Sequence, residues 1–178
     1  VAVKDFYREL DMRRSVLTRR MTVTMRSGAE ISVETVRFLP LPRRELGVIR
    51  YAVTPLNRAA EITFSPHIDA DVRNADANYD EKFWEPVATD ADVTQAVELE
   101  GAEFRCETQP EKVRHTATVH CDKGRTATLY KYAGICSSLN HAPADLAAAA
   151  RAVAADGLRT GFDALLKEQE EAWAARWH

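Results

Sequence analysis

The sequence predicts a mainly β protein, an antiparallel β-sandwich followed by two C-terminal α-helices. Apolar and polar side chains alternate over residues 6–138, as in half-buried strands, and Gly or Pro marks the short connections. No helical pattern interrupts these strands, so neighbours along the chain would pair antiparallel. At Pro143 the composition changes to strong helix formers. We expect a sandwich domain over residues 1–139 and a helical linker over residues 140–178.

A β-hairpin opens the strand pattern. Apolar and polar residues alternate over residues 22–25, Ser27-Gly28 supplies a turn, and the alternation resumes at Ile31. The apolar positions change parity at Thr35, and we expect a β-bulge there, because one extra residue reverses the face of every residue that follows. Further strands are expected at residues 49–53, 62–64, 95–99, 103–108, 113–121 and 125–137.

Two helices are expected after residue 140. Pro143 stands at a first-turn position, an alanine-rich run follows, and Gly157 is expected to close the first helix. In the second helix, apolar residues recur at three- and four-residue spacing and so share one face: Phe162, Leu165, Leu166, Trp173 and Trp177. The two tryptophans end this face where few residues remain to cover them. We expect both indole rings to be exposed, or covered by another chain or domain.

Composition excludes several classes of protein. Lys and Arg number 24 against 27 Asp and Glu, and the net charge of −3 does not support a nucleic-acid partner. No window reaches the roughly 18 apolar residues of a membrane span, and no signal-peptide pattern is present, so we expect no membrane partner and a cytoplasmic location. Cys106, Cys121 and Cys136 form no C-x-x-C pair, so we predict no disulfide framework and no metal site, with all three thiols buried.

The stretch over residues 67–92 is acidic and fits neither pattern, which is typical of a long functional connection. Its start resembles a calcium loop, but Asn74 stands where such a loop needs Gly, so no metal is expected. Its aromatic side chains either stack on a sugar ring or anchor the loop to the sandwich, and both alternatives stay open. The candidate substrate-rim or interdomain residues are Asn74, Tyr79, Phe83 and Trp84.

Five segments together resemble glycoside hydrolase family 65, which contains the maltose, trehalose and kojibiose phosphorylases and related hydrolases. They are LDMRRSVLTRRMTV (10–23), Arg37-Phe38, IRYAVTPLN (49–57), YKYAGICSS (130–138) and the closing G-x-x-x-L-L-K-E-Q-E-x-A-W-x-x-x-W (161–177). The resemblance covers nearly all of this chain but only a minority of a family enzyme, which is several times longer.

This resemblance implies an N-terminal super-sandwich domain, joined by linker helices to an (α/α)6 barrel that holds the active site. In the family, a glutamate of the barrel acts as general acid, and inorganic phosphate, or water in the hydrolases, attacks with inversion. No position here matches that glutamate, so we expect no catalytic residue in this chain. Two departures stand out, since the first sandwich strands are missing before Val1 and Gln169 stands where a histidine is expected. We therefore expect a fragment that is inactive alone.

The resemblance implies that this region braces the barrel and the dimer of a disaccharide phosphorylase or hydrolase. Its expected partners are the missing barrel, a second copy in a homodimer and, in the parent enzyme, an α-linked glucose disaccharide. No cofactor is expected, apart from inorganic phosphate as co-substrate if the parent is a phosphorylase. The residues expected to pack against the barrel are Phe162, Leu166, Trp173 and Trp177. The alternative is a free-standing carbohydrate-binding or adhesion sandwich.

Overall fold

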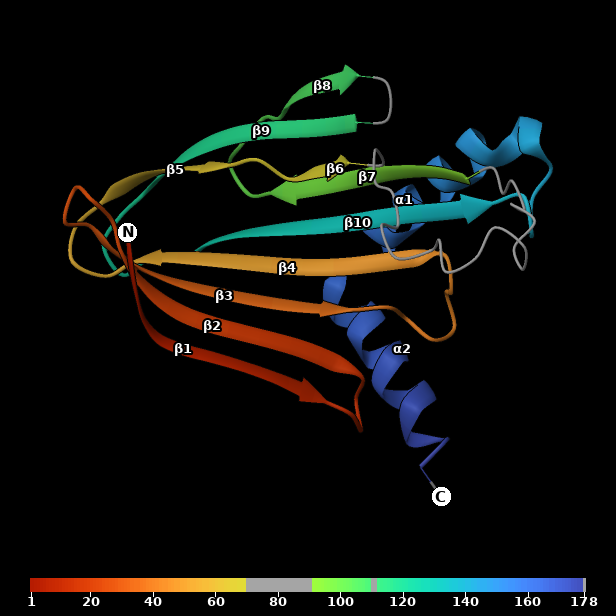
Figure 1. Cartoon of the computed structure of the whole chain (residues 1–178), viewed down its shortest axis with the longest axis horizontal. Coiled ribbons are helices and arrows are strands. Elements are labelled where there is room, and N and C mark those ends of the chain that lie inside the picture. The colour runs from red at the N-terminus through yellow and green to blue at the C-terminus, as the bar shows by residue number, and fades with distance from the viewer. Residues whose placement is uncertain (70–90, 110–111, 178) are drawn as a thin grey trace, which may run out of the picture.

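The computed structural model describes residues 1–69, 91–109 and 112–177. Along this part of the chain, strands come first and two α-helices follow, as the sequence predicts (Figure 1). The elements are β1 (Ala2–Asp11), β2 (Val16–Thr24), β3 (Glu30–Phe38), β4 (Leu46–Pro55), β5 (Ala60–Phe64), β6 (His67–Asp69), β7 (Ala91–Leu99), β8 (Arg105–Gln109), β9 (Lys112–Cys121), β10 (Ala127–Ser137), a 3-10 turn (Pro143–Asp145), α1 (Leu146–Thr160) and α2 (Phe162–Ala174). Neither helix is long and apolar enough to cross a membrane.

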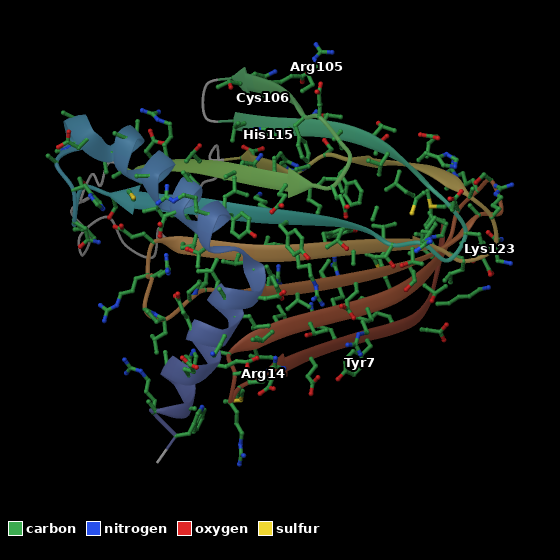
Figure 2. All side chains as sticks on the ribbon, turned by 180° about the vertical axis from the view of Figure 1, so that it is seen from behind. Tyr7, Arg14, Arg105, Cys106, His115 and Lys123 are labelled. Atoms are coloured by element: carbon green, nitrogen blue, oxygen red, sulfur yellow. The ribbon has the colours of Figure 1, made fainter. Side chains whose placement is uncertain are left out.

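The strands form two sheets in which all described neighbours pair antiparallel. The large sheet has the order β1-β2-β3-β4-β10-β7, and the small sheet has the order β5-β9-β6, with β8 also paired to β9. Figure 2 shows both helices in front of the large sheet when the molecule is seen from behind, and α1 packs on β10 and β7. The fold is therefore a mainly β sandwich with a helical layer on one face of its large sheet.

Different layers cover the large sheet at its two ends. At one end the helices bury Val36, Phe38, Leu46, Val48 and Tyr132. At the other end the small sheet buries Val53, Leu99 and Leu129. Because successive side chains of a strand point to opposite faces, the buried parity changes along β2, β3, β4 and β10, where the cover changes.

The prediction of a β-bulge at Thr35 is wrong, and the change of covering layer explains the change of parity instead. The pairing of β3 with both neighbours runs without a register shift through Thr35, which lies opposite Arg19 and Tyr51. Ile31 packs toward the small sheet, whereas Phe38 lies in the core under the helices. The apolar positions therefore change parity because the helices and the small sheet cover opposite faces of the large sheet. An irregular register occurs instead in β1, between Lys4 and Tyr7.

The first helix ends later than the sequence predicts. Gly157 lies inside α1, which continues to Thr160, and the chain turns at Gly161, whose φ of 80° favours glycine. Gly157 is needed for a different reason, because a Cβ atom there would lie 2.9 Å from the Leu46 side chain. This glycine is therefore a packing residue, and the break between α1 and α2 belongs to Gly161.

The cysteines are only partly as expected. Cys121 and Cys136 are buried in the two halves of the core. Cys106 is exposed, which corrects the expectation for this residue, because every residue of β8 is exposed (Figure 2). Strand β8 pairs with β9 at the edge of the small sheet. In such an edge strand, an alternating sequence does not show that another layer buries one of its faces.

Helix α1 approaches β10 at backbone contact distance. A Cβ atom on Gly134 of β10 would lie 2.1 Å from the carbonyl oxygen of Ala150, which no rotamer relieves. Ala150 and Ala154 are buried on the same side of the helix. The alanine-rich run therefore supplies a small-residue face that allows this approach.

We predict that Gly134→Ala lowers the free energy of unfolding by about 3 kcal/mol, the upper end of the range for overpacking, because α1 must move off the sheet. Gly47 of β4 is the matched control, since a Cβ atom there meets the Leu39 side chain at an ordinary 3.6 Å. Gly47→Ala should leave stability unchanged or raise it by up to about 1 kcal/mol. Urea unfolding of both variants measures the difference, and equal effects would contradict the backbone contact.

Candidate functional site

The first residue of α2 is fixed in the core beneath the large sheet. The Phe162 ring lies 5.5 Å from the ring of Phe38 and 5.6 Å from that of Tyr130, and the Arg50 guanidinium lies 5.1 Å above it. Phe162 is only 4% exposed. The expectation that Phe162 packs against another domain is therefore wrong, because its apolar surface is used within this chain.

A buried amide ties the middle of α2 to two loops. Gln169 is fully buried, and its Oε1 accepts a hydrogen bond from the Leu41 N–H at 2.7 Å. Its Nε2 donates to the Ser15 carbonyl at 3.4 Å. An amide offers both a donor and an acceptor, so one side chain satisfies backbone groups from two segments. Gln169, which departs from the family pattern, thus has a structural role here.

Charged contacts join α2 to α1 and to the sheet. The Arg43 guanidinium donates twice to the Glu168 carboxylate, at 2.8 and 2.9 Å, and also pairs with Asp156 of α1. The hydrogen bonds from Arg43 are the largest influence on the Glu168 carboxyl and hold its pKa below the usual value. Arg14 in the β1–β2 turn pairs with Glu170. Together these contacts fix the direction in which α2 leaves the sheet.

The tryptophan pair lies at the C-terminal end of the described chain, where Trp173 belongs to α2 and Trp177 follows the end of this helix. The two indole rings lie 6.4 Å apart and are tilted by 31°. Trp177 is 51% exposed, whereas Trp173 is half-buried. The Trp173 Nε1–H is buried and has no hydrogen-bond acceptor within the described part of the chain. Leu166 packs partly against the core under the helices, whereas Trp177 and part of Trp173 stay exposed near the end of α2.

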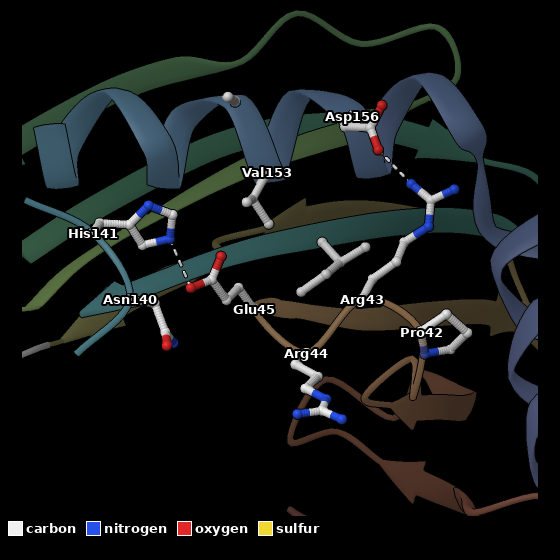
Figure 3. A pocket seen from close by; sticks show the side chains of 10 residues that line it. Pro42, Arg43, Arg44, Glu45, Asn140, His141, Val153 and Asp156 are labelled. Atoms are coloured by element: carbon white, nitrogen blue, oxygen red, sulfur yellow. Dashed lines mark hydrogen bonds and ion pairs between the residues drawn. The ribbon is translucent and has the colours of Figure 1, made fainter. Parts of the chain in front are cut away.

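A cavity of about 670 Å³ lies between α1 and the loops at residues 42–46 and 140–141 (Figure 3). On its wall, His141 Nε2–H donates to Glu45 Oε1 at 2.8 Å. Cys136 lies next to this pair, and the ligand atoms of the three residues are all within 4.8 Å of one another. Sequence reasoning missed this cluster, because the residues lie in three separate segments and no local spacing connects them.

The remaining predicted residues fall in different places. Asn74, Tyr79, Phe83 and Trp84 lie outside the described residues. His115, on β9, is half-buried and hydrogen-bonded to Gln95 at 2.8 Å, and burial lowers its pKa. The structure therefore brings together the C-terminal tryptophans but does not join them to the cavity residues.

The profile of one protein family matches residues 1–176 of this chain, and its description is glycosyl hydrolase family 65, N-terminal domain. The chain belongs to this family. Maltose phosphorylase of Bacillus subtilis (strain 168) is a relative of this family 65 domain, with 25% identity over 195 residues. That alignment covers 98% of the domain and 26% of the maltose phosphorylase.

A solved structure of a putative kojibiose phosphorylase from human microbiome has the same fold. It superposes on 97% of the family 65 domain with a TM-score of 0.77 and 16% sequence identity, and the match covers 25% of that chain. The domain thus spans about a quarter of the length of the proteins to which it is similar. The resemblance read from the five sequence segments is confirmed.

We predict that Arg43→Met destabilises the domain by about 1 kcal/mol at neutral pH, the upper end for partly exposed ion pairs. Because the folded-state pKa of Glu168 is lowered, its contribution is present above the unfolded value of about 4.3 and is lost as the pH falls through the folded value. The difference from wild type should therefore shrink in acid. Denaturant unfolding between neutral and acidic pH measures it.

Arg44→Met is the matched control, because Arg44 is exposed and forms no ion pair with the residues that the structure describes. It should have little effect at any pH. A destabilisation by Arg43→Met that stays constant down to low pH would show that Arg43 acts through the packing of its methylene groups.

Proposed function

We propose that this chain is the non-catalytic N-terminal domain of a longer enzyme that cleaves an α-linked glucose disaccharide by inverting phosphorolysis or hydrolysis. The family match carries this proposal, because it spans residues 1–176 while the relatives are about four times longer. The domain supports a separate catalytic barrel and helps to form a homodimer. Inorganic phosphate is a co-substrate of the parent enzyme if that enzyme is a phosphorylase.

The polar groups around the cavity support a role without catalysis. Glycoside cleavage needs an acidic and a basic carboxyl group that face each other across the bond. At the cavity, Glu45 accepts a hydrogen bond from His141, and Asp156 pairs with Arg43 (Figure 3). Both carboxylates are thus engaged by partners within the domain.

The end of α2 supports contact with the catalytic domain. Trp177 exposes a large apolar ring, and the buried Trp173 Nε1–H lacks an acceptor among the described residues. A second domain that covers this turn would remove apolar surface from water and supply the missing acceptor. In this proposal, Trp173 and Trp177 face the barrel, and Leu166 extends that contact. The side chains proposed for the substrate rim are Asn74, Tyr79, Phe83 and Trp84.

The first test is activity. We predict that the isolated chain cleaves neither maltose, trehalose nor kojibiose, with or without inorganic phosphate, because the proposal places the catalytic groups in the separate barrel. Release of glucose or of glucose 1-phosphate is the measurement, with the B. subtilis maltose phosphorylase as positive control for maltose. Turnover by this chain would contradict the proposal. Saturable sugar binding that Trp84→Ala abolishes would favour a free-standing carbohydrate-binding module instead.

The second test concerns the tryptophan surface. We predict that Trp177→Ala changes the stability of the isolated chain by less than about 0.5 kcal/mol, because the ring is exposed. In the longer polypeptide the same change should lower the melting temperature. Leu139→Ala is the matched control, since Leu139 is 77% exposed and follows β10 rather than α2. Equal effects of the two variants in the longer polypeptide would exclude docking at Trp177.

A further inference from the structure

Three metal-ligating side chains meet at the cavity beside α1. Glu45 precedes β4, Cys136 lies near the end of β10, and His141 follows that strand. Backbone hydrogen bonds hold the three segments together, since the Ile135 N–H donates to the Glu45 carbonyl at 2.9 Å and the His141 N–H donates to the Ser137 carbonyl at 3.1 Å. The cluster is therefore positioned by the backbone and not only by its side chains.

The three ligand atoms of this cluster are near enough to converge on one metal ion. Ligands at 2.0–2.3 Å from zinc lie roughly 3.3–3.6 Å from each other. Here the His141 and Glu45 ligand atoms are 2.8 Å apart, and all three ligand atoms lie within 4.8 Å of one another. Shifts of roughly 0.5 Å between His141 and Glu45, and of up to roughly 1.2 Å for the Cys136 sulfur, would admit the ion. Glu45 and His141 also line the cavity, which leaves room for water as a fourth ligand.

The electrostatic environment favours a cation. The Glu45 carboxylate places negative charge within 4.8 Å of the Cys136 sulfur and 2.8 Å from His141 Nε2. Of the arginines at the cavity, Arg43 is paired with Asp156 and Glu168, and Arg44 is exposed. A divalent ion bound to the Cys136 sulfur would displace one proton from the thiol and neutralise both the thiolate and the Glu45 carboxylate.

We propose that Glu45, Cys136 and His141 bind a divalent transition-metal ion of the zinc type. Thiolate and imidazole ligands select such ions over Mg²⁺ and Ca²⁺, which prefer oxygen. The ion joins the start of β4, the end of β10 and the loop that leads to α1, so its role is structural. This site is independent of the proposed disaccharide chemistry, and its failure would leave that function untouched.

The test uses Co²⁺, whose absorption reports a thiolate ligand and tetrahedral geometry. The whole chain with Cys106→Ser, which removes the exposed thiol, is titrated near neutral pH. We expect one Co²⁺ per chain, a thiolate-to-cobalt charge-transfer band, displacement by Zn²⁺ and no displacement by Mg²⁺. Absence of the band at Co²⁺ saturation would overturn the proposal.

Variants decide which thiol binds. Cys136→Ser should abolish the charge-transfer band, whereas Cys121→Ser, the matched control at the other buried thiol, should keep it. His141→Ala should weaken Co²⁺ binding by more than about 100-fold, because second-shell changes alone cost 10–100-fold. This variant keeps the buried core intact, and Zn²⁺ should raise the melting temperature of wild type but not of His141→Ala. A band that persists in Cys136→Ser, or affinity unchanged in His141→Ala, would overturn the proposal.

Discussion

Helix α1 reaches the large sheet through residues that have almost no side-chain volume. The carbonyl of Ala150 lies where a Cβ atom of Gly134 would be, so the helix and β10 touch through their backbones. This contact sets the height of α1 above the sheet, which in turn determines where the chain turns at Gly161 and where α2 begins. Burial of Phe162 and the position of the C-terminal tryptophans follow from that starting point.

The direction of α2 depends on polar contacts in addition to apolar burial. Gln169 uses both ends of its amide, and Arg43 joins the two helices through carboxylates from each. Such contacts depend on geometry more strongly than apolar packing does, because hydrogen bonds weaken steeply when misaligned. Trp177, which follows the end of α2, remains exposed in this domain.

The cavity and the tryptophan turn lie on different parts of the helical layer, and their proposed roles differ accordingly. At the cavity, Glu45, Cys136 and His141 connect segments within the domain. At the end of α2, an apolar ring and an unsatisfied N–H of the described structure favour contact with another domain. In the two proposals, the cavity cluster stabilises the domain itself, and the tryptophans form a contact with another domain.

The sequence by itself determined the hairpin around Gly28, most of the later strands, the two helices after Pro143 and membership of family 65, because local periodicity and ordered motifs carry that information. It did not predict β1, or β6 within the stretch expected to be a long connection. Only the tertiary structure decided which layer covers each strand, and so explained the parity change at Thr35 without a bulge. It also decided that Phe162 is buried and that Cys136 meets Glu45 and His141. These outcomes depend on contacts between residues far apart in the chain, and one-dimensional spacing does not encode such contacts.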